Sequence, residues 1–214
     1  MSAAAARPLA ADNVTDFSAR KLELIEGAAE VFARAGYHGC SMRDVAERIG
    51  IRQSSIYHHF RSKDEILAAI CTYGGESFLR NIRAIGGGPG TVLEKIGAVV
   101  RAHVTPYVLR QHYAYSFVFM RQHLTGNAKA VVSRLARAYE HELEELLRAG
   151  VGAGDLDPAI DVRMTSLALL GMCNSVSFWA GRESDVSIDR VARGFTRTLI
   201  DGVRTRAAPA AGAA

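Results

Sequence analysis

From Ser41 to Lys63, apolar residues recur at the spacing of two short helices separated by Gly50. Ser41 offers an N-cap for the first helix, and Gly50 follows it as a stop signal. The apolar side of this first helix consists of Met42, Val45, Ala46 and Ile49. We therefore expect a short helix that begins after Ser41 and ends before Gly50.

A second short helix is expected over residues 53–60. Ile56 and Phe60 are four residues apart and form its buried face, while Ile51 fills the turn before it. The remaining positions leave a polar side facing outward, made of Gln53, Ser54, Ser55, His58 and His59. Two short helices of this kind predict a helix-turn-helix whose second helix can donate and accept hydrogen bonds.

A helix over residues 18–35 precedes this pair, because Leu22, Ile25, Ala29 and Phe32 form one stripe before Gly36. Asp16 or Ser18 can cap its start. Arg20 and Lys21 fall in its first turn, where positive charge opposes the helix dipole. A phosphate would compensate this charge, and simple solvation is the alternative.

A fourth helix is expected from Ser62 to about residue 85. Ser62 is its N-cap, and Asp64 and Glu65 lie in the first turn, as the helix dipole prefers. The glycine-rich segment 86–90 closes it. This segment does not resemble a phosphate-binding loop, because no Gly-Lys-Ser/Thr follows it and no strand precedes it.

Four more helices are expected, over residues 91–106, 128–149, 158–179 and 185–204. Pro106 should end or kink the first of them, because proline removes a backbone donor. The segment 107–124 that follows is unusually rich in aromatic residues. The second of these helices has an apolar stripe of Val131, Leu135, Ala138, Leu143 and Leu146 or Leu147. Asp157 and Pro158 are the expected cap and first residue of the third.

The helix expected over residues 158–179 is apolar on nearly all sides. A helix without a polar face must be covered all round, so we expect part of it to contact a second subunit. The last helix carries a single stripe of Ile188, Val191, Phe195, Leu199 and Val203. No strand is expected, and the predicted fold class is therefore all-α.

Composition is that of a soluble globular protein, with 214 residues and 49% hydrophobic content. No apolar run approaches the roughly twenty residues that span a bilayer, and the N-terminus lacks the pattern of a secretory signal. Three scattered cysteines indicate neither disulfides nor a paired metal motif, which favours a cytoplasmic protein. We expect a disordered arm over residues 1–17 and a disordered tail over residues 207–214.

The net charge of +4 does not by itself indicate DNA binding, because residues 1–75 hold nine basic and nine acidic residues. The local order is more informative. No acidic residue lies between Arg48 and Lys63, so Arg48, Arg52, Arg61 and Lys63 form a small basic patch beside the second short helix.

The stretch AAEVFARAGYHGCSMRDVAERIGIRQSSIYHHFRSKDEIL, residues 28–67, resembles the TetR/AcrR family of bacterial regulators. The residues that carry the resemblance are Phe32, Gly36, Ala46, Gly50, the block Ile56 to Phe60 and the cap Ser62 to Glu65. The resemblance implies a helix-turn-helix DNA-binding domain over residues 18–63 and a helical ligand-binding and dimerisation domain over residues 64–206. It also implies a homodimer, a double-stranded operator of two related half-sites, and a small-molecule effector that loosens DNA binding.

The resemblance also implies roles for single residues. Tyr57 and Lys63 match positions that touch phosphates. Positions that reach bases or adjacent backbone correspond to Arg43, Gln53, Ser54, Ser55 and His58. These roles agree with chemistry, because glutamine pairs with adenine and arginine with guanine. The alternatives are that Tyr57 mainly packs and that His59 rests against the scaffold.

The C-terminal half is less diagnostic. The run Asn174 to Trp179 looks similar to a branch of the family that senses acyl-CoA thioesters, but this chain departs from that branch at residues 180–183. Candidate effector contacts are His103, Tyr107, Phe117, Arg121, Met172 and Phe178, since an apolar cavity with a few polar groups is typical of ligand sites. The alternative for each of these residues is ordinary core.

An enzyme is the main rival hypothesis, and the sequence does not favour it. There is no Gly-x-Ser-x-Gly elbow, and His103, His112, His123 and His141 lack metal-ligand spacing. We therefore predict no catalytic residue, metal site or cofactor. The predicted function is a ligand-responsive repressor that a small apolar or acyl-CoA-type effector releases from DNA. An activator or dual regulator of the same fold, and a helical interaction module without DNA binding, are the alternatives.

Overall fold

The computed structural model describes residues 19–180 and 186–203. Every element assigned within these ranges is a helix, which confirms the predicted all-α class. The helices are α1 (Ala19–Ala35), α2 (Met42–Ile49), α3 (Gln53–Tyr57), α4 (Lys63–Gly87), α5 (Val92–Val108), α6 (His112–Tyr115), the π-helix η1 (Ser116–Met120), the 3₁₀-helix η2 (Arg121–His123), α7 (Gly126–Ala153), α8 (Val162–Trp179) and α9 (Ile188–Val203). Several predictions lie outside the described residues: the arm 1–17, the tail 207–214, the caps Asp16 and Ser18, and the two ends of the last helix, Asp185 and Arg204.

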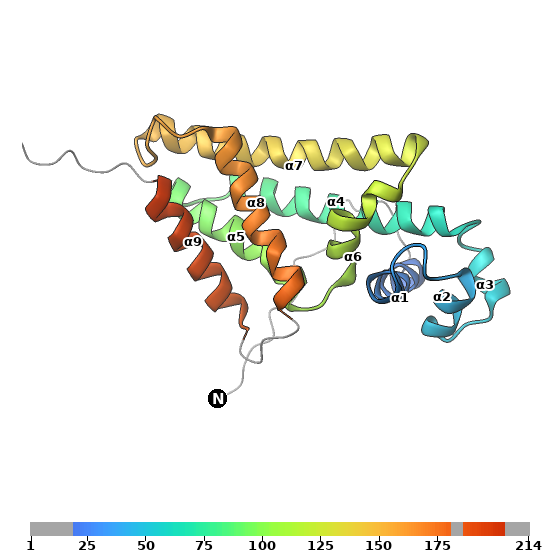
Figure 1. Cartoon of the computed structure of the whole chain (residues 1–214). Helices are drawn as coiled ribbons and strands as arrows, with labels where there is room; N and C mark the ends of the chain where they lie inside the picture. Colours follow the sequence, from blue (N-terminus) through green and yellow to red (C-terminus); the bar gives the residue numbers. More distant parts are fainter. Residues whose placement is uncertain (1–18, 181–185, 204–214) are drawn as a thin grey trace, which may run out of the picture.

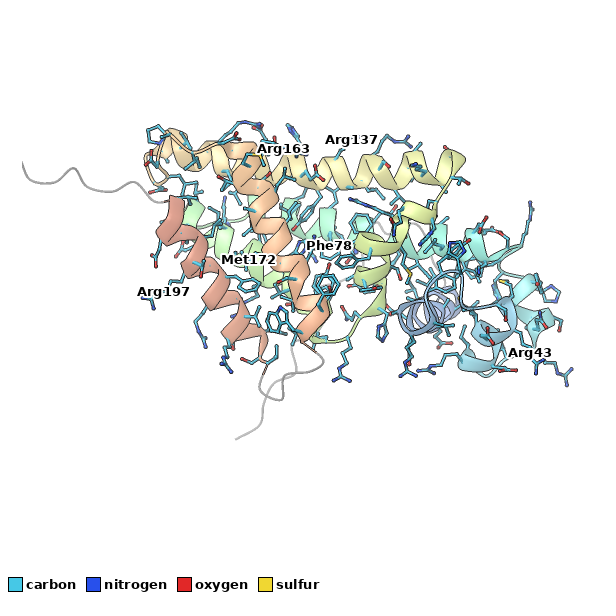
Figure 2. The ribbon with its side chains drawn as sticks, in the orientation of Figure 1. Arg43, Phe78, Arg137, Arg163, Met172 and Arg197 are labelled. Carbon is cyan, nitrogen blue, oxygen red and sulfur yellow. The ribbon has the colours of Figure 1, made fainter. Side chains whose placement is uncertain are left out.

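The helices form two groups that α4 connects. Helices α1 to α3 form a compact unit at one end, and α4 leads out of that unit and runs alongside α7 (Figure 1). Helices α5, α8 and α9 pack at the other end, with α5 against both α8 and α9. Side chains fill the space between α4, α5, α7 and η1, so the core is continuous from Leu24 in α1 to Leu199 in α9 (Figure 2).

Local signals explain the helix-turn-helix. Ser41 and Asp44 form a capping box at the start of α2, and Gly50 ends that helix at φ +73°, a left-handed conformation that favours glycine. Helix α3 ends at Tyr57 and not at residue 60 as expected. Phe60 nevertheless stays in the core, because its N–H donates to the Ile56 carbonyl at 2.9 Å and so keeps the turn closed.

Several of the predicted helix boundaries are wrong. Helix α5 continues through Pro106 to Val108, because the proline lies in the last turn and the Leu109 N–H still reaches the Thr105 carbonyl at 2.9 Å. Helix α4 includes the first two glycines of the segment 86–90. Helix α7 extends beyond the predicted range 128–149 at both ends.

The start of α8 also differs from the prediction. Asp161, not Asp157, caps this helix by accepting from the Met164 N–H at 3.0 Å. Asp157 instead accepts from the Ala159 N–H at 2.8 Å in the preceding turn. The fully buried Leu156 holds that turn against the core, so the chain reaches the start of α8 four residues later than expected.

The predicted stripe of α7 is displaced by about one position along its first half. Val131, Leu135 and Ala138 are only partly buried, whereas Val132, Ala136 and Tyr139 lie in the core. Further along the helix, Leu143, Leu146 and Leu147 are buried as predicted. The displacement follows from the packing of α7 against α4, which brings the hydroxyl-bearing Tyr139 inward.

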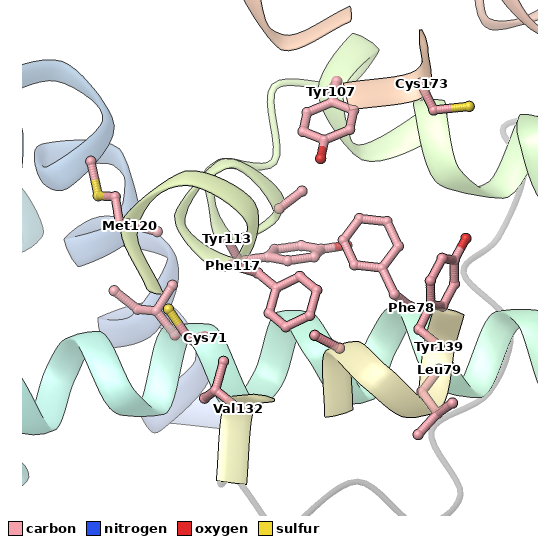
Figure 3. Close-up of a cluster of buried hydrophobic side chains, with 14 of the residues drawn as sticks. Cys71, Phe78, Leu79, Tyr107, Tyr113, Phe117, Met120, Val132, Tyr139 and Cys173 are labelled. Atoms are coloured by element: carbon pink, nitrogen blue, oxygen red, sulfur yellow. The ribbon is translucent and has the colours of Figure 1, made fainter. Parts of the chain in front are cut away.

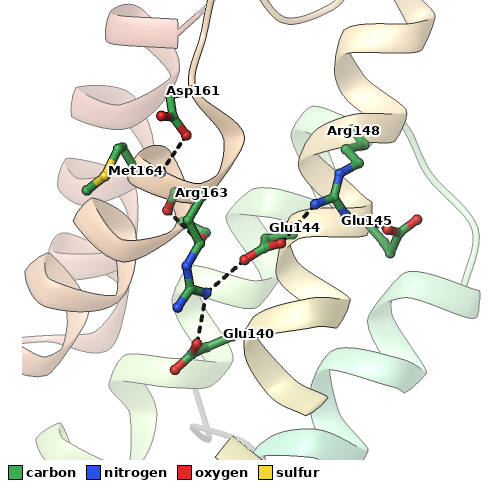
Figure 4. A network of polar contacts seen from close by, with 8 residues as sticks. Glu140, Glu144, Glu145, Arg148, Asp161, Arg163 and Met164 are labelled. Carbon is green, nitrogen blue, oxygen red and sulfur yellow. Dashed lines mark hydrogen bonds and ion pairs between the residues drawn. The ribbon is translucent and has the colours of Figure 1, made fainter. Parts of the chain in front are cut away.

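An arginine joins α8 to α7. The Arg163 guanidinium lies 2.8 Å from carboxylate oxygens of both Glu140 and Glu144, and Arg148 binds Glu144 from within α7 at 2.9 Å (Figure 4). Exposed ion pairs of this kind stabilise a fold by about 1 kcal/mol at most. Their effect here is positional, because they hold the start of α8 to the middle of α7.

Candidate DNA-binding surface and effector core

The surface of α3 is polar and exposed, as the sequence predicts. Gln53, Ser54 and His58 face solvent, Ser55 is half-buried, and 48% of Tyr57 is exposed. Ile56, between them, is fully buried in the core, where α3 packs against α2. The exposure of Tyr57 argues against a mainly packing role. His59 is exposed too, so the expectation that it rests against the scaffold is not met.

The predicted basic patch is smaller than the sequence suggests. The Arg48 guanidinium turns to α1 and pairs with Glu30, which also binds Arg34 at 2.9 Å. These contacts hold the pKa of the Glu30 carboxyl below its usual range, with the hydrogen bond from Arg48 as the largest cause. Within the described ranges, Arg52 and Arg61 have no carboxylate partner in an ion pair. They remain available to phosphates.

Arg43 also has a partner, because its Nε lies 2.8 Å from Glu47 one turn along α2. Both side chains are well exposed, and Arg43 points out from this end of the molecule (Figure 2). Screening by solvent makes an exposed i,i+4 pair worth a few tenths of a kcal/mol. Glu47 therefore holds Arg43 only weakly.

Lys63 and Asp64, at the start of α4, bind the loop between α1 and α2. The Lys63 ammonium donates to the carbonyls of Tyr37 at 2.6 Å and Cys40 at 2.9 Å, and it lies 4.5 Å from the centre of the Tyr37 ring. The Tyr37 hydroxyl donates to the Asp64 carboxylate. Two of the three Lys63 N–H groups are thus engaged inside the protein.

The same loop contacts the C-terminal half through aromatic rings. Tyr37 stacks on His123 of η2, with ring centres 5.1 Å apart and planes inclined by 18°. His38 meets His123 edge to face at 4.8 Å. Because Tyr37 also holds Lys63 and Asp64, this cluster connects the start of α4 to η2.

The π-helix η1 lies directly before η2 and is a feature that the sequence analysis missed. Phe117 of η1 packs against two glycines of α4: a Cβ at Gly74 would lie 2.9 Å from the Phe117 Cβ, and one at Gly75 would lie 2.7 Å from its ring. The Ser116 hydroxyl is buried and has no hydrogen-bond partner in the described part of the chain. π-Helical turns are rare and often occur at functional sites.

The C-terminal helices enclose an aromatic core that contains a hydrogen-bonded polar quartet. Rings of Phe78, Tyr107, Tyr113, Phe117 and Tyr139 gather between α4, α5, α7 and η1 (Figure 3). The quartet consists of His103, Tyr107, Tyr139 and Asn174. His103 Nδ1 lies 2.8 Å from the Tyr139 hydroxyl, His103 Nε2 lies 3.0 Å from Asn174 Oδ1, and the Tyr107 hydroxyl lies 3.1 Å from the same oxygen.

These contacts define the roles of each atom. Asn174 Oδ1 can only accept, so His103 carries its proton on Nε2 and Tyr107 donates its hydroxyl proton. His103 Nδ1 is then an acceptor, and the Tyr139 hydroxyl donates to it. All three buried rings are satisfied without any charged partner.

Burial keeps this core neutral. It lowers the pKa of His103 to about 4, because the imidazolium would be desolvated. Burial raises the pKa of the Cys71 and Cys173 thiols to about 12 and the pKa of Tyr139 well above its ordinary value. At neutral pH each of these groups is therefore uncharged.

A small pocket opens beside the quartet between α4, α5 and α7. Its lining includes Phe78, Ile82, His103 and Tyr139, and the side chains leave no room in it for a molecule the size of water. Ligand pockets usually measure about 300–1,000 Å³. An effector would have to enlarge this pocket by moving side chains.

The predicted effector residues are only partly brought together. His103, Tyr107 and Phe117 lie in the core, and Arg121 lies 5.5 Å from the centre of the Phe117 ring. Met172 is half-buried, and Phe178 is 58% exposed against the ring of Phe119. Tyr139 and Phe78 also belong to this core but were not among the predicted effector residues, and Asn174 was noted only within a family resemblance. The signal for Asn174 was a lone amide within the apolar run of α8.

Among residues 19–180 and 186–203, no helix combines the length and the hydropathy needed to cross a bilayer. These residues also contain no group of three or more His, Cys, Asp or Glu side chains placed to hold a metal ion.

Comparison with known proteins gives matches along most of the chain. The family described as "Bacterial regulatory proteins, tetR family" matches residues 24–70, and "Tetracyclin repressor-like, C-terminal domain" matches residues 89–203. The repressor KstR2 of Rhodococcus jostii (strain RHA1) is 28% identical over 201 residues, which cover 92% of this chain and 97% of the relative.

Two solved structures share the fold. AibR in complex with isovaleryl coenzyme A and operator DNA has a TM-score of 0.75 at 22% identity, covering 83% of this chain and 96% of that one. The regulator FadR of Bacillus subtilis in complex with stearoyl-CoA has a TM-score of 0.70 at 20% identity, covering 86% and 99%.

Proposed function

The chain belongs to the TetR family of bacterial DNA-binding transcription regulators, and from this premise we propose that it is a cytoplasmic, ligand-responsive repressor. It binds a pseudo-palindromic operator as a homodimer and leaves the DNA when a small apolar or acyl-CoA-type effector enters the C-terminal half. The observation that carries the proposal is the surface of α3, whose polar side chains are exposed over the buried Ile56.

The proposed DNA contacts follow from this surface. Gln53, Ser54, Ser55 and His58 read base edges or nearby backbone, and Tyr57 donates its hydroxyl to a phosphate. Arg52 and Arg61 add charge beside the helix. Arg43 contributes once DNA displaces Glu47. Lys63 has a single N–H left for a phosphate, so its main contribution is to hold the loop from Tyr37 to Cys40 against α4.

We divide the chain into a DNA-binding domain over residues 18–63 and an effector and dimerisation domain over residues 64–206. Helix α4 belongs physically to both, because its first two residues bind the loop after α1 and its length packs on α7. A shift of α4 would therefore move both parts together.

The exposed face of α8 supports the homodimer. It presents Met164, Leu167, Ala168, Gly171 and Phe178 to solvent, on the side away from the buried Leu169, Cys173 and Val176. An apolar helical face of this kind requires cover, and a second copy of α8 provides it across a two-fold axis.

Gly171 offers a direct test of the dimer. A Cβ at Gly171 would meet nothing within 4 Å, so Gly171→Arg fits the single chain but would obstruct a partner. We expect light scattering to give twice the 23.1 kDa chain mass for the wild type and the single mass for Gly171→Arg. Gly152→Arg in α7 is the matched control, since a Cβ there also meets nothing within 4 Å. A single-mass wild type, or a dimeric Gly171→Arg, would contradict the interface.

The effector class rests on the solved relatives. Their bound isovaleryl coenzyme A and stearoyl-CoA are both acyl thioesters, and the aromatic core of this chain offers an apolar environment for an acyl group. Entry of such a group would displace η1. Because η2 follows η1, His123 would then shift against Tyr37 and carry the change to Lys63 and Asp64.

The function is tested by selecting bound sites from random duplex DNA with the full chain, then adding acyl-CoA esters to the complex. We expect selection of a two-fold related sequence and release of that DNA in a mobility-shift assay. Failure to enrich any sequence would overturn the DNA-binding proposal. Enrichment without release would overturn the effector class alone.

A further inference from the structure

The polar quartet and its surroundings can stabilise a neutral ligand but not an anion. His103, Tyr107, Tyr139 and Asn174 are neutral, and the neighbouring Cys173 and Cys71 thiols are uncharged as well. A buried anion without a paired cation costs several kcal/mol or changes its protonation instead. The part of a ligand that enters this core must therefore be uncharged.

Arg121 lies at the edge of this region and offers the alternative, a contact with a ligand carboxylate. The Arg121 guanidinium lies 5.5 Å from the centre of the Phe117 ring. The Phe117 ring contacts Phe78 at 5.8 Å, and Phe78 contacts His103 at 4.8 Å. Arg121 thus reaches the quartet only through a series of two aromatic rings in contact, Phe117 and Phe78. A ligand carboxylate held by Arg121 would bind outside the quartet.

The quartet has donor capacity that its internal bonds do not use. Asn174 Oδ1 accepts from both His103 and Tyr107, but the two N–H groups on Asn174 Nδ2 have no partner within the described part of the chain. Among the described residues, the side-chain atom that is both fully shielded and without a partner is Ser116 Oγ, so Asn174 Nδ2 is not fully shielded. It is therefore open to a further group, and an unpaired amide donor favours an acceptor such as a carbonyl oxygen.

We propose that the quartet is the polar end of the effector site and selects an uncharged, carbonyl-bearing ligand, such as a thioester, an ester or a ketone, with Asn174 Nδ2 as the donor to that carbonyl. Tyr107 acts as a positioning residue, because its hydroxyl holds Asn174 in the orientation that presents the amide nitrogen. The inference rests on the proposed function only in taking this core as the effector site.

The first test compares matched ligands by calorimetry with the full chain in the absence of DNA. The probes are N-acetylcysteamine thioesters of isovaleric, octanoic and dodecanoic acid, and the sodium salts of the same acids. We expect at least one thioester to bind at least about tenfold more tightly than its carboxylate at pH 7.5, the effect of about one hydrogen bond plus the charge. A carboxylate that binds as tightly as its thioester, or no binding of any thioester, would overturn the proposal.

The acidity of the probe gives a second arm. A fatty acid enters this core only in its protonated form, so its affinity should rise by about tenfold for each unit by which pH falls from 7.5 to 6. The thioester affinity should stay constant over that range, because His103, with a pKa of about 4, remains neutral. An acid whose affinity does not change with pH would bind as the anion, which contradicts the proposal.

Variants locate the contact. Asn174→Asp keeps the oxygen that accepts from His103 and Tyr107 but removes the N–H donors, and we expect thioester affinity to fall by about tenfold or more. Tyr107→Phe should lower the thioester-to-carboxylate affinity ratio by about threefold or more. Tyr113→Phe is its matched control, because Tyr113 is equally buried and its hydroxyl also donates to an amide oxygen, that of Gln111 at 2.9 Å.

Arg121→Gln tests the alternative that Arg121 holds a ligand carboxylate. The substitution should change thioester affinity by less than about twofold. Full thioester affinity in Asn174→Asp, or an equal change of the ratio in Tyr107→Phe and Tyr113→Phe, would refute the assigned roles. If Asn174→Asp does not fold, the tyrosine pair decides. Thioester binding without DNA release would leave this inference intact, while the proposed release of DNA by an acyl-CoA-type effector fails. DNA release by carboxylates that bind as anions would overturn this inference and leave the proposed ligand-responsive repressor intact.

Discussion

The α3 surface and the aromatic core of the C-terminal helices use polar side chains in opposite ways. On α3 and directly after it, Gln53, Ser54 and His58 face solvent, and their side chains form no hydrogen bond or ion pair with the described residues. In the core, His103 is 5% exposed and bonds to Tyr139 and Asn174 on two other helices. An exposed polar group costs folding nothing and stays free for a partner. A buried one must be paired, and removing its partner incurs a desolvation penalty.

The largest effect is expected on the core side of this contrast. His103→Ala removes a buried ring and leaves the Tyr139 hydroxyl and one Asn174 bond without a partner. We expect it to lower the free energy of unfolding by about 3–4 kcal/mol in urea titrations at pH 7. The exposed His141→Ala in α7 should stay within about 0.5 kcal/mol. Equal effects of the two changes would show that the quartet contributes nothing.

The same histidine predicts a pH dependence of stability. Its pKa is about 4 in the folded chain and about 6.5 when exposed, so the unfolded chain binds the extra proton between these values. The neutral, buried His103 therefore adds about 3 kcal/mol to the free energy of unfolding above about pH 6.5, and this addition is lost as pH falls toward 4. The stability gap between wild type and His103→Ala should therefore narrow from pH 7 to pH 4. A constant gap would mean that His103 becomes protonated without unfolding.

A smaller effect is expected where η1 approaches α4. A Cβ at Gly74 would lie 2.9 Å from the Phe117 Cβ and 3.1 Å from the Tyr113 carbonyl oxygen, atoms that cannot rotate away. Gly74→Ala should cost about 1–3 kcal/mol of unfolding free energy, although alanine favours helices. Gly86→Ala in the same helix meets nothing within 4 Å and should be neutral or stabilising by up to about 1 kcal/mol. Thermal melts of both variants would show whether this close approach is required.

The smallest effects are expected on α3, where substitutions should leave stability unchanged. Tyr57→Ala should weaken binding to specific and nonspecific DNA alike, by about 1 kcal/mol, because a phosphate contact carries no sequence information. Gln53→Ala should instead reduce the difference between the selected operator and unrelated DNA. Mobility-shift titrations measure both, with urea titrations as the control for folding. If neither variant differs from wild type, α3 is not the reading helix.

The contrast between the α3 surface and the buried core also explains which features could be predicted from the sequence. The caps at Ser41 and Ser62, the glycine at position 50 and the buried pair Ile56 and Phe60 were all predictable, because they depend on residues a few positions apart. Helix α3 was accordingly predicted at its correct start. The start of α8 was not, because the fully buried Leu156 and the choice between Asp157 and Asp161 depend on how the turn meets the core.

The polar quartet could not be predicted, because His103, Tyr139 and Asn174 come from α5, α7 and α8 and share no local pattern. The same holds for the pairing of Arg48 with Glu30, which removes one arginine from the expected basic patch. Charge and hydropathy along the chain give the composition of a surface or core, but not which side chains meet.

The sequence by itself thus determined the all-α class, the helix-turn-helix and the exposed face of α3, since helix periodicity and capping act over one or two turns. Only the tertiary structure decided which polar groups are satisfied and where η1 leaves α-helical geometry. It also decided that Tyr37, in the loop after α1, stacks on His123 of η2. These features depend on the burial of groups distant in sequence, and the cost of leaving such groups unpaired is set by their neighbours in space.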